Sequence, residues 1–166
     1  MSDIGHTYVP PQSVTSKTIP DQIVRYFDGK DLLQKTQAIR LSTVDAAGWP
    51  HASLLSAGDV LAMSPERLRF AVFAQSTTTA NLLRDGRVTA TLSIDRGMCE
   101  VRMRARCLTK ATSDISLAMF EATVEQVRMH IAPYADVTTG ITFQLHKPGE
   151  VLRRWESQID ALRKVR

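Results

Sequence analysis

Residues 67 to 109 constrain the fold most, because β-prone runs and turn signals alternate there at short intervals. A first β-rich run leads into small hydroxyl residues, a short helical segment that a glycine ends, and two more β-rich runs joined by a tight turn. These segments are Arg67–Ala74, Gln75–Thr79, Ala80–Asp85, Gly86, Arg87–Ile94, Asp95–Gly97 and Met98–Leu108. Short runs of β-branched and aromatic residues between turn signals are typical of strands in hairpins. The stretch therefore predicts three strands interrupted by one short helix.

The hydroxyl cluster Gln75–Thr79 lies where a strand leads into a helix. Unpaired backbone N–H groups point out of a helix N-terminus, and the helix dipole favours an anion there. Ser and Thr side chains can add hydrogen bonds, so the cluster predicts a phosphate site. The same residues are ordinary helix N-caps, and this second interpretation stays open.

The residues before this stretch predict an arm, a helix and a hairpin. Residues 1–17 are polar and interrupted by Pro, which predicts a flexible N-terminal arm, and residues 18–166 have the length of a single domain. Pro20 is well placed to begin a helix that ends at Tyr26 or Phe27, and Asp31–Gln37 predicts another helical turn. Ala38–Val44 and His51–Leu61 predict a hairpin, with a bend at Gly58–Asp59 in its second strand.

The last third of the chain predicts two helices with a strand between them. Thr112 or Ser113 can cap a helix from about Asp114 to His130, because apolar residues follow helical spacing there. These residues are Leu117, Phe120, Val124, Val127 and Ile131. Thr138–Leu145 predicts a strand. Val151–Val165 predicts a closing helix whose inner face is Leu152, Trp155, Ile159 and Leu162.

About six mainly antiparallel strands and few helices predict a mainly β fold, a β-barrel with helices packed on its outside. A doubly wound sheet is not expected, because the strands do not alternate with long helices. With a net charge of +4, no long apolar run and no signal-peptide core, the chain is expected to be cytoplasmic, to bind neither membrane nor nucleic acid, and to suit a small anion.

Cys99, Cys107 and the histidines predict neither a disulfide nor a metal site. The cysteines lie on one predicted strand, about 26 Å apart at roughly 3.3 Å per residue, so they cannot pair within it. They are interpreted as reduced packing residues in a reducing compartment. The four histidines lack close metal-ligand spacing. On the same strand, Glu100, Arg102, Arg104 and Arg106 share one face, for which a solvent face is favoured over a ligand contact.

This order and spacing resemble the pyridoxamine 5'-phosphate oxidase-like, FMN-binding split-barrel family over residues 20 to 155. The likeness rests on Ile39–Val44, on Gly48–Leu55, and on the spacing Ser76-x-x-x-x-Asn81-Leu82-Leu83-x-Asp85-x-Arg87-Val88. The resemblance implies a split β-barrel, a homodimer, and FMN at the subunit interface.

The resemblance also implies a set of cofactor-binding residues. Ser76, Thr77 and Thr78 match the phosphate loop, and Asn81 lies on the helix that follows. His51 and Ser53 begin a strand that approaches the flavin, and Ser56 falls near a position often held by a basic phosphate ligand. Glu100 and Arg102 match a strand beside the flavin ring. The loop departs from the family because it lacks Lys or Arg, so weak FMN binding is expected unless Arg69, Arg84, Arg87, Arg102 or a partner subunit's arginine compensates.

The function that these implications favour is an FMN-dependent oxidoreductase of unknown substrate. Pyridoxamine phosphate is not expected as the substrate, because the sequence shows no second basic cluster for its phosphate. Two alternatives stay open. One is a non-catalytic protein that binds or senses a flavin, a deazaflavin or haem on the same dimeric barrel, and the other is a dimeric scaffold that has lost its ligand.

Overall fold

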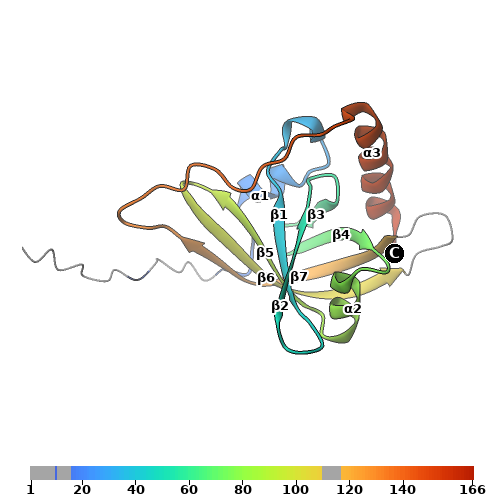
Figure 1. The fold of residues 1–166 in the computed structure, drawn as a ribbon, viewed down its shortest axis with the longest axis horizontal. Helices are drawn as coiled ribbons and strands as arrows, with labels where there is room; N and C mark the ends of the chain where they lie inside the picture. The colour runs from blue at the N-terminus through green and yellow to red at the C-terminus, as the bar shows by residue number, and fades with distance from the viewer. Residues whose placement is uncertain (1–9, 11–15, 110–116) are drawn as a thin grey trace, which may run out of the picture.

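One antiparallel sheet of seven strands organises the fold, in the order β2-β1-β5-β6-β7-β4-β3 (Figure 1). The structure is a computed structural model that describes residues 10, 16–109 and 117–166. Its strands are β1 (Ile39–Val44), β2 (Pro50–Leu55), β3 (Val60–Ser64), β4 (Arg67–Phe73), β5 (Arg87–Ile94), β6 (Gly97–Thr109) and β7 (Leu117–His130). Its helices are α1 (Asp21–Tyr26), the short 3-10 helix η1 (Leu32–Gln34), α2 (Thr77–Arg84) and α3 (Pro148–Lys164). The mainly β prediction is confirmed, with seven strands instead of six and a sheet that does not close between β2 and β3.

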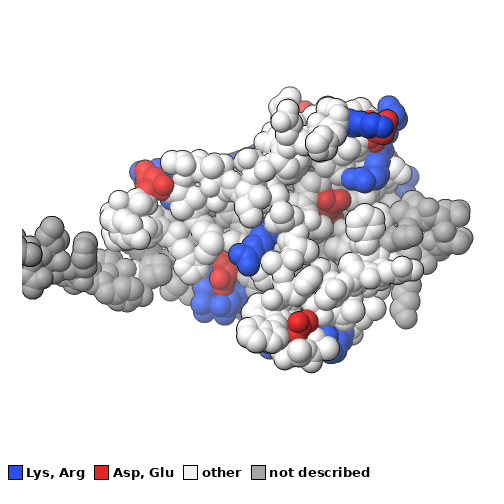
Figure 2. All heavy atoms as spheres, in the orientation of Figure 1, with Lys and Arg blue, Asp and Glu red and all other residues white. Residues whose placement is uncertain are grey.

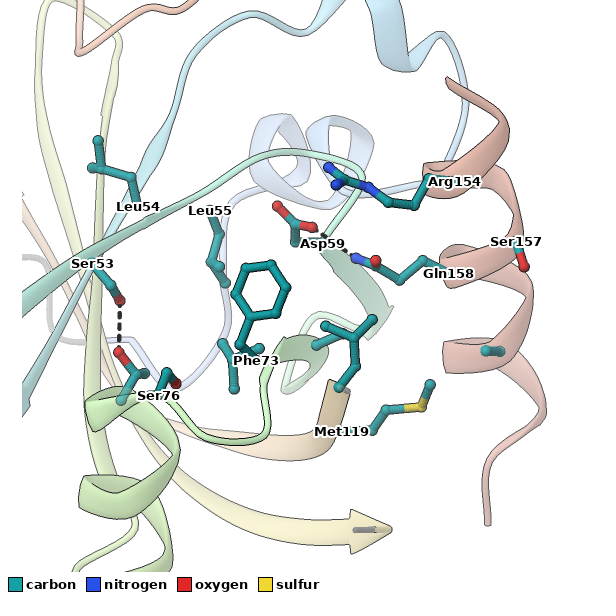
Figure 3. A pocket seen from close by; sticks show the side chains of 15 residues that line it. Ser53, Leu54, Leu55, Asp59, Phe73, Ser76, Met119, Arg154, Ser157 and Gln158 are labelled. Atoms are coloured by element: carbon teal, nitrogen blue, oxygen red, sulfur yellow. Dashed lines mark hydrogen bonds between the residues drawn. The ribbon is translucent and has the colours of Figure 1, made fainter. Parts of the chain in front are cut away.

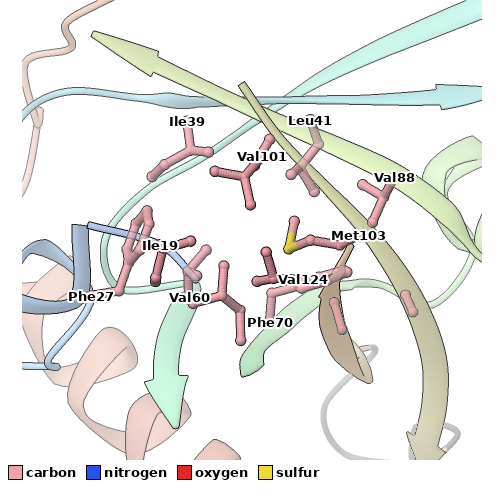
Figure 4. Packing of buried hydrophobic residues seen from close by; sticks show 14 of the residues in the cluster. Ile19, Phe27, Ile39, Leu41, Val60, Phe70, Val88, Val101, Met103 and Val124 are labelled. Atoms are coloured by element: carbon pink, nitrogen blue, oxygen red, sulfur yellow. The ribbon is translucent and has the colours of Figure 1, made fainter. Parts of the chain in front are cut away.

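The main core lies on the concave face of the curved sheet, where alternate side chains of most strands meet (Figure 4). Phe70 of β4 and Phe120 of β7 stack there with ring centroids 5.7 Å apart, and both are fully buried. Helix α1 adds Ile23, and Phe27 follows at its end. The expected helix after Pro20 and the β1–β2 hairpin are both confirmed.

The segment expected to be a helix over Asp114–His130 is instead strand β7, so that prediction is wrong. β7 pairs with β4 on one side and with β6 on the other. A register shift opposite Arg102 and Met103 leaves Glu125 as an extra residue, and the buried positions therefore step from Val124 to Val127. A β-bulge thus reproduced the three-residue step of a helix. The proposed caps Thr112 and Ser113 lie outside the described residues.

The predicted strand His51–Leu61 is two strands, because the turn at residues 56–59 ends β2 and starts β3. Asp59 closes this turn: its Oδ2 accepts hydrogen bonds from the backbone N–H of Ser56 at 2.7 Å and from Ser56 Oγ at 2.6 Å. β2 and β3 consequently occupy opposite edges of the sheet. The strand predicted at Thr138–Leu145 is also wrong, since the segment makes a single isolated bridge between Thr142 and Gln37.

Helix α3 forms a second layer against β3 and β4, and the closing helix is confirmed. Trp155, Ile159 and Leu162 are buried in a separate apolar cluster with residues of β3, β4 and η1, while Leu152 is half-buried. Arg69 of β4 fixes the end of this helix, because its Nη1 donates to the carbonyl oxygens of Leu162 and Val165, each at 2.8 Å.

The charged row on β6 is confirmed as a solvent face whose members form ion pairs. Arg102 donates to Glu100 at 2.7 Å, and Arg104 and Arg106 bind glutamates of β7. Neither Cys99 nor Cys107 forms a disulfide, as expected. Burial raises the pKa of the Cys99 thiol to about 12, which keeps it protonated at neutral pH. The arm predicted for residues 1–17 falls mostly outside the described residues.

Candidate functional site

A cavity of about 580 Å³ lies between strand β2, the start of α2 and helix α3 (Figure 3). Its size is typical of a small-molecule site. Its wall is mostly apolar, with polar groups at two places. The lining residues are Ser53, Leu54, Leu55, Asp59, Ala71, Val72, Phe73, Ser76, Thr78, Leu117, Met119, Arg154, Ser157, Gln158 and Ala161.

Three of the predicted cofactor-binding residues, Ser53, Ser76 and Thr78, line one end of this cavity, which we call the hydroxyl end. Thr78 Oγ1 donates to Ser53 Oγ at 3.1 Å, a bond that joins α2 to β2. Ser76 is the N-cap of α2, because its Oγ accepts from the backbone N–H of Thr79 at 3.1 Å. The cap interpretation is therefore confirmed. The helix geometry still leaves the N–H groups of Thr77 and Thr78 without an intrahelical acceptor.

The other predicted residues of the α2 and β2 region lie beside the cavity without lining it. Thr77 is exposed on the first turn of α2. Asn81 is buried, and its Nδ2 donates to Thr43 Oγ1 at 2.9 Å, so it fastens α2 to β1. Ser56 is buried behind the lining residue Asp59, to which it donates. These contacts give Asn81 and Ser56 structural roles.

His51, Glu100 and Arg102 are not brought to the cavity. His51 lies on β2 and pairs with Thr43 of β1 in the register of the sheet. Glu100 and Arg102 bind each other on the outer face of β6. As cofactor contacts, these three residues stay predictions that the cavity of this chain does not support.

The four arginines considered as substitutes for a basic loop residue are all bound elsewhere. Arg69 pairs with Glu121 at 2.9 Å, and Arg102 pairs with Glu100. Arg84 donates to the carbonyl oxygen of Val44 and to Asn81. Arg87 forms a bidentate pair with Asp85 and holds the pKa of that carboxyl at about 2. None of the four lines the cavity.

Helix α3 supplies a side of the cavity that sequence reasoning missed, the α3 wall of Arg154, Ser157, Gln158 and Ala161. Their three- and four-residue spacing places them on one helix face, adjacent to the buried stripe, and this spacing was the signal available in the sequence. Gln158 Nε2 donates to Asp59 Oδ1 at 2.7 Å and to the carbonyl oxygen of Gly58 at 3.1 Å. The buried amide thus locks α3 onto the 56–59 turn.

Apolar side chains remain open to solvent at the cavity. Phe73 is 68% exposed and Leu54 is 54% exposed, and Figure 3 places Phe73 between the hydroxyl end and the α3 wall. Trp49 is 71% exposed in the β1–β2 turn, and Trp155 is buried beneath α3. Figure 2 shows charged side chains scattered over one face of the molecule, with no continuous basic patch on its described part.

Gly58 should be intolerant of any side chain, because a Cβ there would overlap the indole ring of Trp155. Trp155 is 3% exposed and packs edge-on against Phe143, so the ring has no space to move into. We expect Gly58→Ala to cost about 1–3 kcal/mol in urea unfolding and to displace α3 from the cavity. Gly149→Ala is the matched control in α3, since its nearest neighbouring atom is 3.9 Å away. Equal stability of the two variants would contradict the tight contact.

The described residues contain neither a metal-binding cluster nor a membrane-spanning helix. No three His, Cys, Asp or Glu side chains gather as a metal site in residues 16–109 and 117–166. Within the same ranges, no helix has the length and apolar character needed to span a bilayer.

Comparison with known proteins identifies one sequence relative and the fold. No known protein-family model matches the chain. YclD, an uncharacterized protein of Bacillus subtilis strain 168, is 33% identical over 146 residues, which cover 87% of this chain and 95% of YclD. A crystal structure of a candidate pyridoxamine 5'-phosphate oxidase from Lactobacillus delbrueckii has a TM-score of 0.54 at 17% identity, and the match covers 69% of this chain and 97% of that one.

HupZ of Group A Streptococcus is a second structural neighbour, with a TM-score of 0.53 at 13% identity, covering 72% of this chain and 98% of HupZ. At such low identities the two solved structures establish the fold alone, whereas the 33% identity with YclD establishes membership of one family. The chain therefore belongs to the same family as YclD, and its fold is of the pyridoxamine 5'-phosphate oxidase-like split-barrel type that its sequence resembles.

Proposed function

We propose that this protein is a homodimeric FMN-binding flavoprotein that acts as an oxidoreductase. The observation that carries the proposal is the cavity itself, which combines an exposed aromatic and aliphatic wall with hydroxyl and amide donors at one end. This combination suits a ligand that has a flat apolar ring and a phosphate. The shared fold with a candidate pyridoxamine 5'-phosphate oxidase supports the proposal by analogy.

The residues present fit the two parts of FMN in different ways. Phe73 and Leu54 offer exposed apolar surface for a ring. At the hydroxyl end, Ser53, Ser76 and Thr78 offer hydroxyl groups, and Thr77 lies beside them on the first turn of α2. The start of α2 adds free N–H groups and its dipole. These donors are neutral, so they lack the Coulomb attraction that a cation would add to its hydrogen bonds with phosphate. The fit is that of a phosphate site of modest affinity.

When bound, FMN would supply the hydride transfer, which protein side chains cannot perform. The chain's own residues would bind and orient it. Ser76, Thr77 and Thr78 would hold the phosphate, and the apolar wall would exclude water. A second copy of the chain would cover the exposed apolar surface at Leu54, Phe73 and Leu83 and complete the enclosure.

The neutral hydroxyl end also favours a second candidate, a non-catalytic protein that stores or senses a flavin or a deazaflavin, or that binds haem. The four arginines considered as substitutes for a basic loop residue are bound elsewhere. Weak anchoring of the phosphate suits reversible uptake better than permanent retention of a cofactor. Anaerobic mixing of FMN-loaded protein with a reduced nicotinamide separates the two candidates, because bleaching of the flavin bands indicates a reductase and no bleaching indicates storage or sensing.

We expect the double variant Thr77→Ala, Thr78→Ala to weaken FMN binding by about tenfold or more, because hydrogen bonds to a charged group contribute about 1.5–3 kcal/mol. Quenching of flavin fluorescence during titration of apo-protein measures the affinity. Thr139→Ala, an exposed threonine outside the cavity, is the control and should leave the affinity unchanged. Unchanged affinity in a folded double variant would remove these threonines from the site. Failure of the unaltered protein to bind FMN would overturn the proposed function.

A further inference from the structure

We infer that Arg154 forms a recognition site for the carboxylate of a small apolar or aromatic acid, which is the class of substrate that the cavity would take. This assignment of a substrate rests on the proposed function, in which FMN occupies the hydroxyl end and the adjoining apolar wall. It adds to the proposed function the chemical group that Arg154, on the opposite side of the cavity, would bind.

Arg154 lies across the cavity from the hydroxyl end. Figure 3 shows its side chain extending from α3 on one side of Phe73, while Ser53 and Ser76 lie on the other side. Leu55 and Phe73 lie between the two places, and Asp59 lies near Arg154. Arg154 is exposed, so a molecule in the cavity can place an apolar body against Leu55 and Phe73 and present its polar group to the guanidinium.

The guanidinium of Arg154 has no ion-pair partner among the described residues, unlike the four arginines considered above. One carboxylate, Asp59, lines the same cavity, but it lies beyond ion-pair distance of Arg154. Both Asp59 oxygens already accept hydrogen bonds, Oδ1 from Gln158 and Oδ2 from Ser56. Arg154 is thus the cation of the cavity whose donors are left for a ligand.

The charge and shape of the α3 wall suit a carboxylate. Arg154 and Asp59 are the charged lining residues in the described chain, so an anion must bind at the guanidinium and away from the Asp59 carboxylate. A carboxylate carries one charge, and its two oxygens match the planar fork of a guanidinium. Ser157, one turn further along α3, adds a neutral hydroxyl on the same face.

Arg153 offers a matched control for this assignment. It is the neighbouring arginine on α3, it is exposed, and it does not line the cavity. Arg153→Gln and Arg154→Gln make the same chemical change one residue apart, so they alter the net charge equally. Any difference between them reports position and not overall charge.

The test uses calorimetric titration of apo-protein and of protein loaded with FMN, with benzoate as the probe and benzamide as its neutral analogue. We expect benzoate to bind at least about tenfold more tightly than benzamide, and Arg154→Gln to weaken benzoate binding by about tenfold or more. Arg153→Gln should stay within twofold of the unaltered protein. Both variants should keep their FMN affinity and their thermal midpoint.

Equal benzoate binding by Arg154→Gln and the unaltered protein would overturn the inference, as would equal binding of benzamide and benzoate. A loss of FMN affinity in Arg154→Gln would also overturn it, since the arginine would then serve the cofactor. The two proposals fail separately. Benzoate binding that needs Arg154 in a protein unable to bind FMN would sustain the carboxylate site and refute the flavoprotein, and the reverse result would refute the carboxylate site alone.

Discussion

Replacing Arg69 by Met is expected to destabilise the protein by about 3–5 kcal/mol, the cost of breaking a buried ion pair from one side. Arg69 Nε donates to Glu121 Oε2 at 2.9 Å, and the two side chains are only 13% and 7% exposed. The variant would leave Glu121 buried with Arg106 as its remaining partner, and Arg106 is 68% exposed. It would also remove the donor from two carbonyl oxygens at the end of α3.

Urea unfolding followed by circular dichroism measures this loss. Arg67→Met is the matched control, because Arg67 is an exposed arginine on the same strand, and it should change the free energy of unfolding by less than about 0.5 kcal/mol. Similar losses in the two variants would show that the Arg69–Glu121 pair contributes little.

The same pair makes stability depend on acid. Burial pushes the pKa of Glu121 upward, but the hydrogen bonds and charges of Arg69 and Arg106 outweigh it, so the pKa lies below its ordinary value of 4.5. For a carboxyl with a lowered folded pKa, the unfolded state binds the proton first, so its contribution is complete above about pH 4.5 and is lost as the pH falls through the folded pKa. Glu121→Gln should therefore show a shallower loss of stability below this pH.

Phe120→Ala is expected to lower the free energy of unfolding by about 3–5 kcal/mol, because it leaves a cavity at the centre of the main core. Phe120 is fully buried and stacks on Phe70 with an interplanar angle of 17°. The control is Glu125→Ala, a change at the exposed bulge residue of the same strand, which should have little effect. Thermal or urea unfolding compares the two, and a loss below about 1 kcal/mol in Phe120→Ala would contradict the packing of β7 into the core.

Local signals in the sequence predicted the elements whose partners lie nearby in the chain. The β1–β2 hairpin, the helix after Ser76 and the β5–β6 hairpin each combine alternating residues with a turn or a cap. Strand β7 was predicted wrongly, because its bulge at Glu125 produced helical spacing in a segment that strands β4 and β6 hold extended. Its partners, and not its own residues, decide its conformation.

In the candidate site, too, one part could be predicted from local sequence and another part could not. The hydroxyl end could be predicted because Ser76, Thr77 and Thr78 are consecutive. The spacing on α3 groups the residues of the α3 wall on one helix face but cannot place that face at the cavity. The contact that places it joins Gln158 to Gly58 across 100 residues, which no local pattern encodes. No local pattern therefore marks Arg154 as a cation of this cavity.

The sheet order has a consequence for how quickly the chain reaches its native state. β4 and β7 are direct neighbours, and the Arg69–Glu121 contact between them spans 52 residues of sequence, while Gln37 contacts Ser93 across 56. Closing these long loops costs conformational entropy before the strand contacts can stabilise the chain. We therefore expect folding on the millisecond-to-second scale of non-local β proteins. Four residues join β2 to β3, but neither strand can take its place at an edge of the sheet until those pairings have formed.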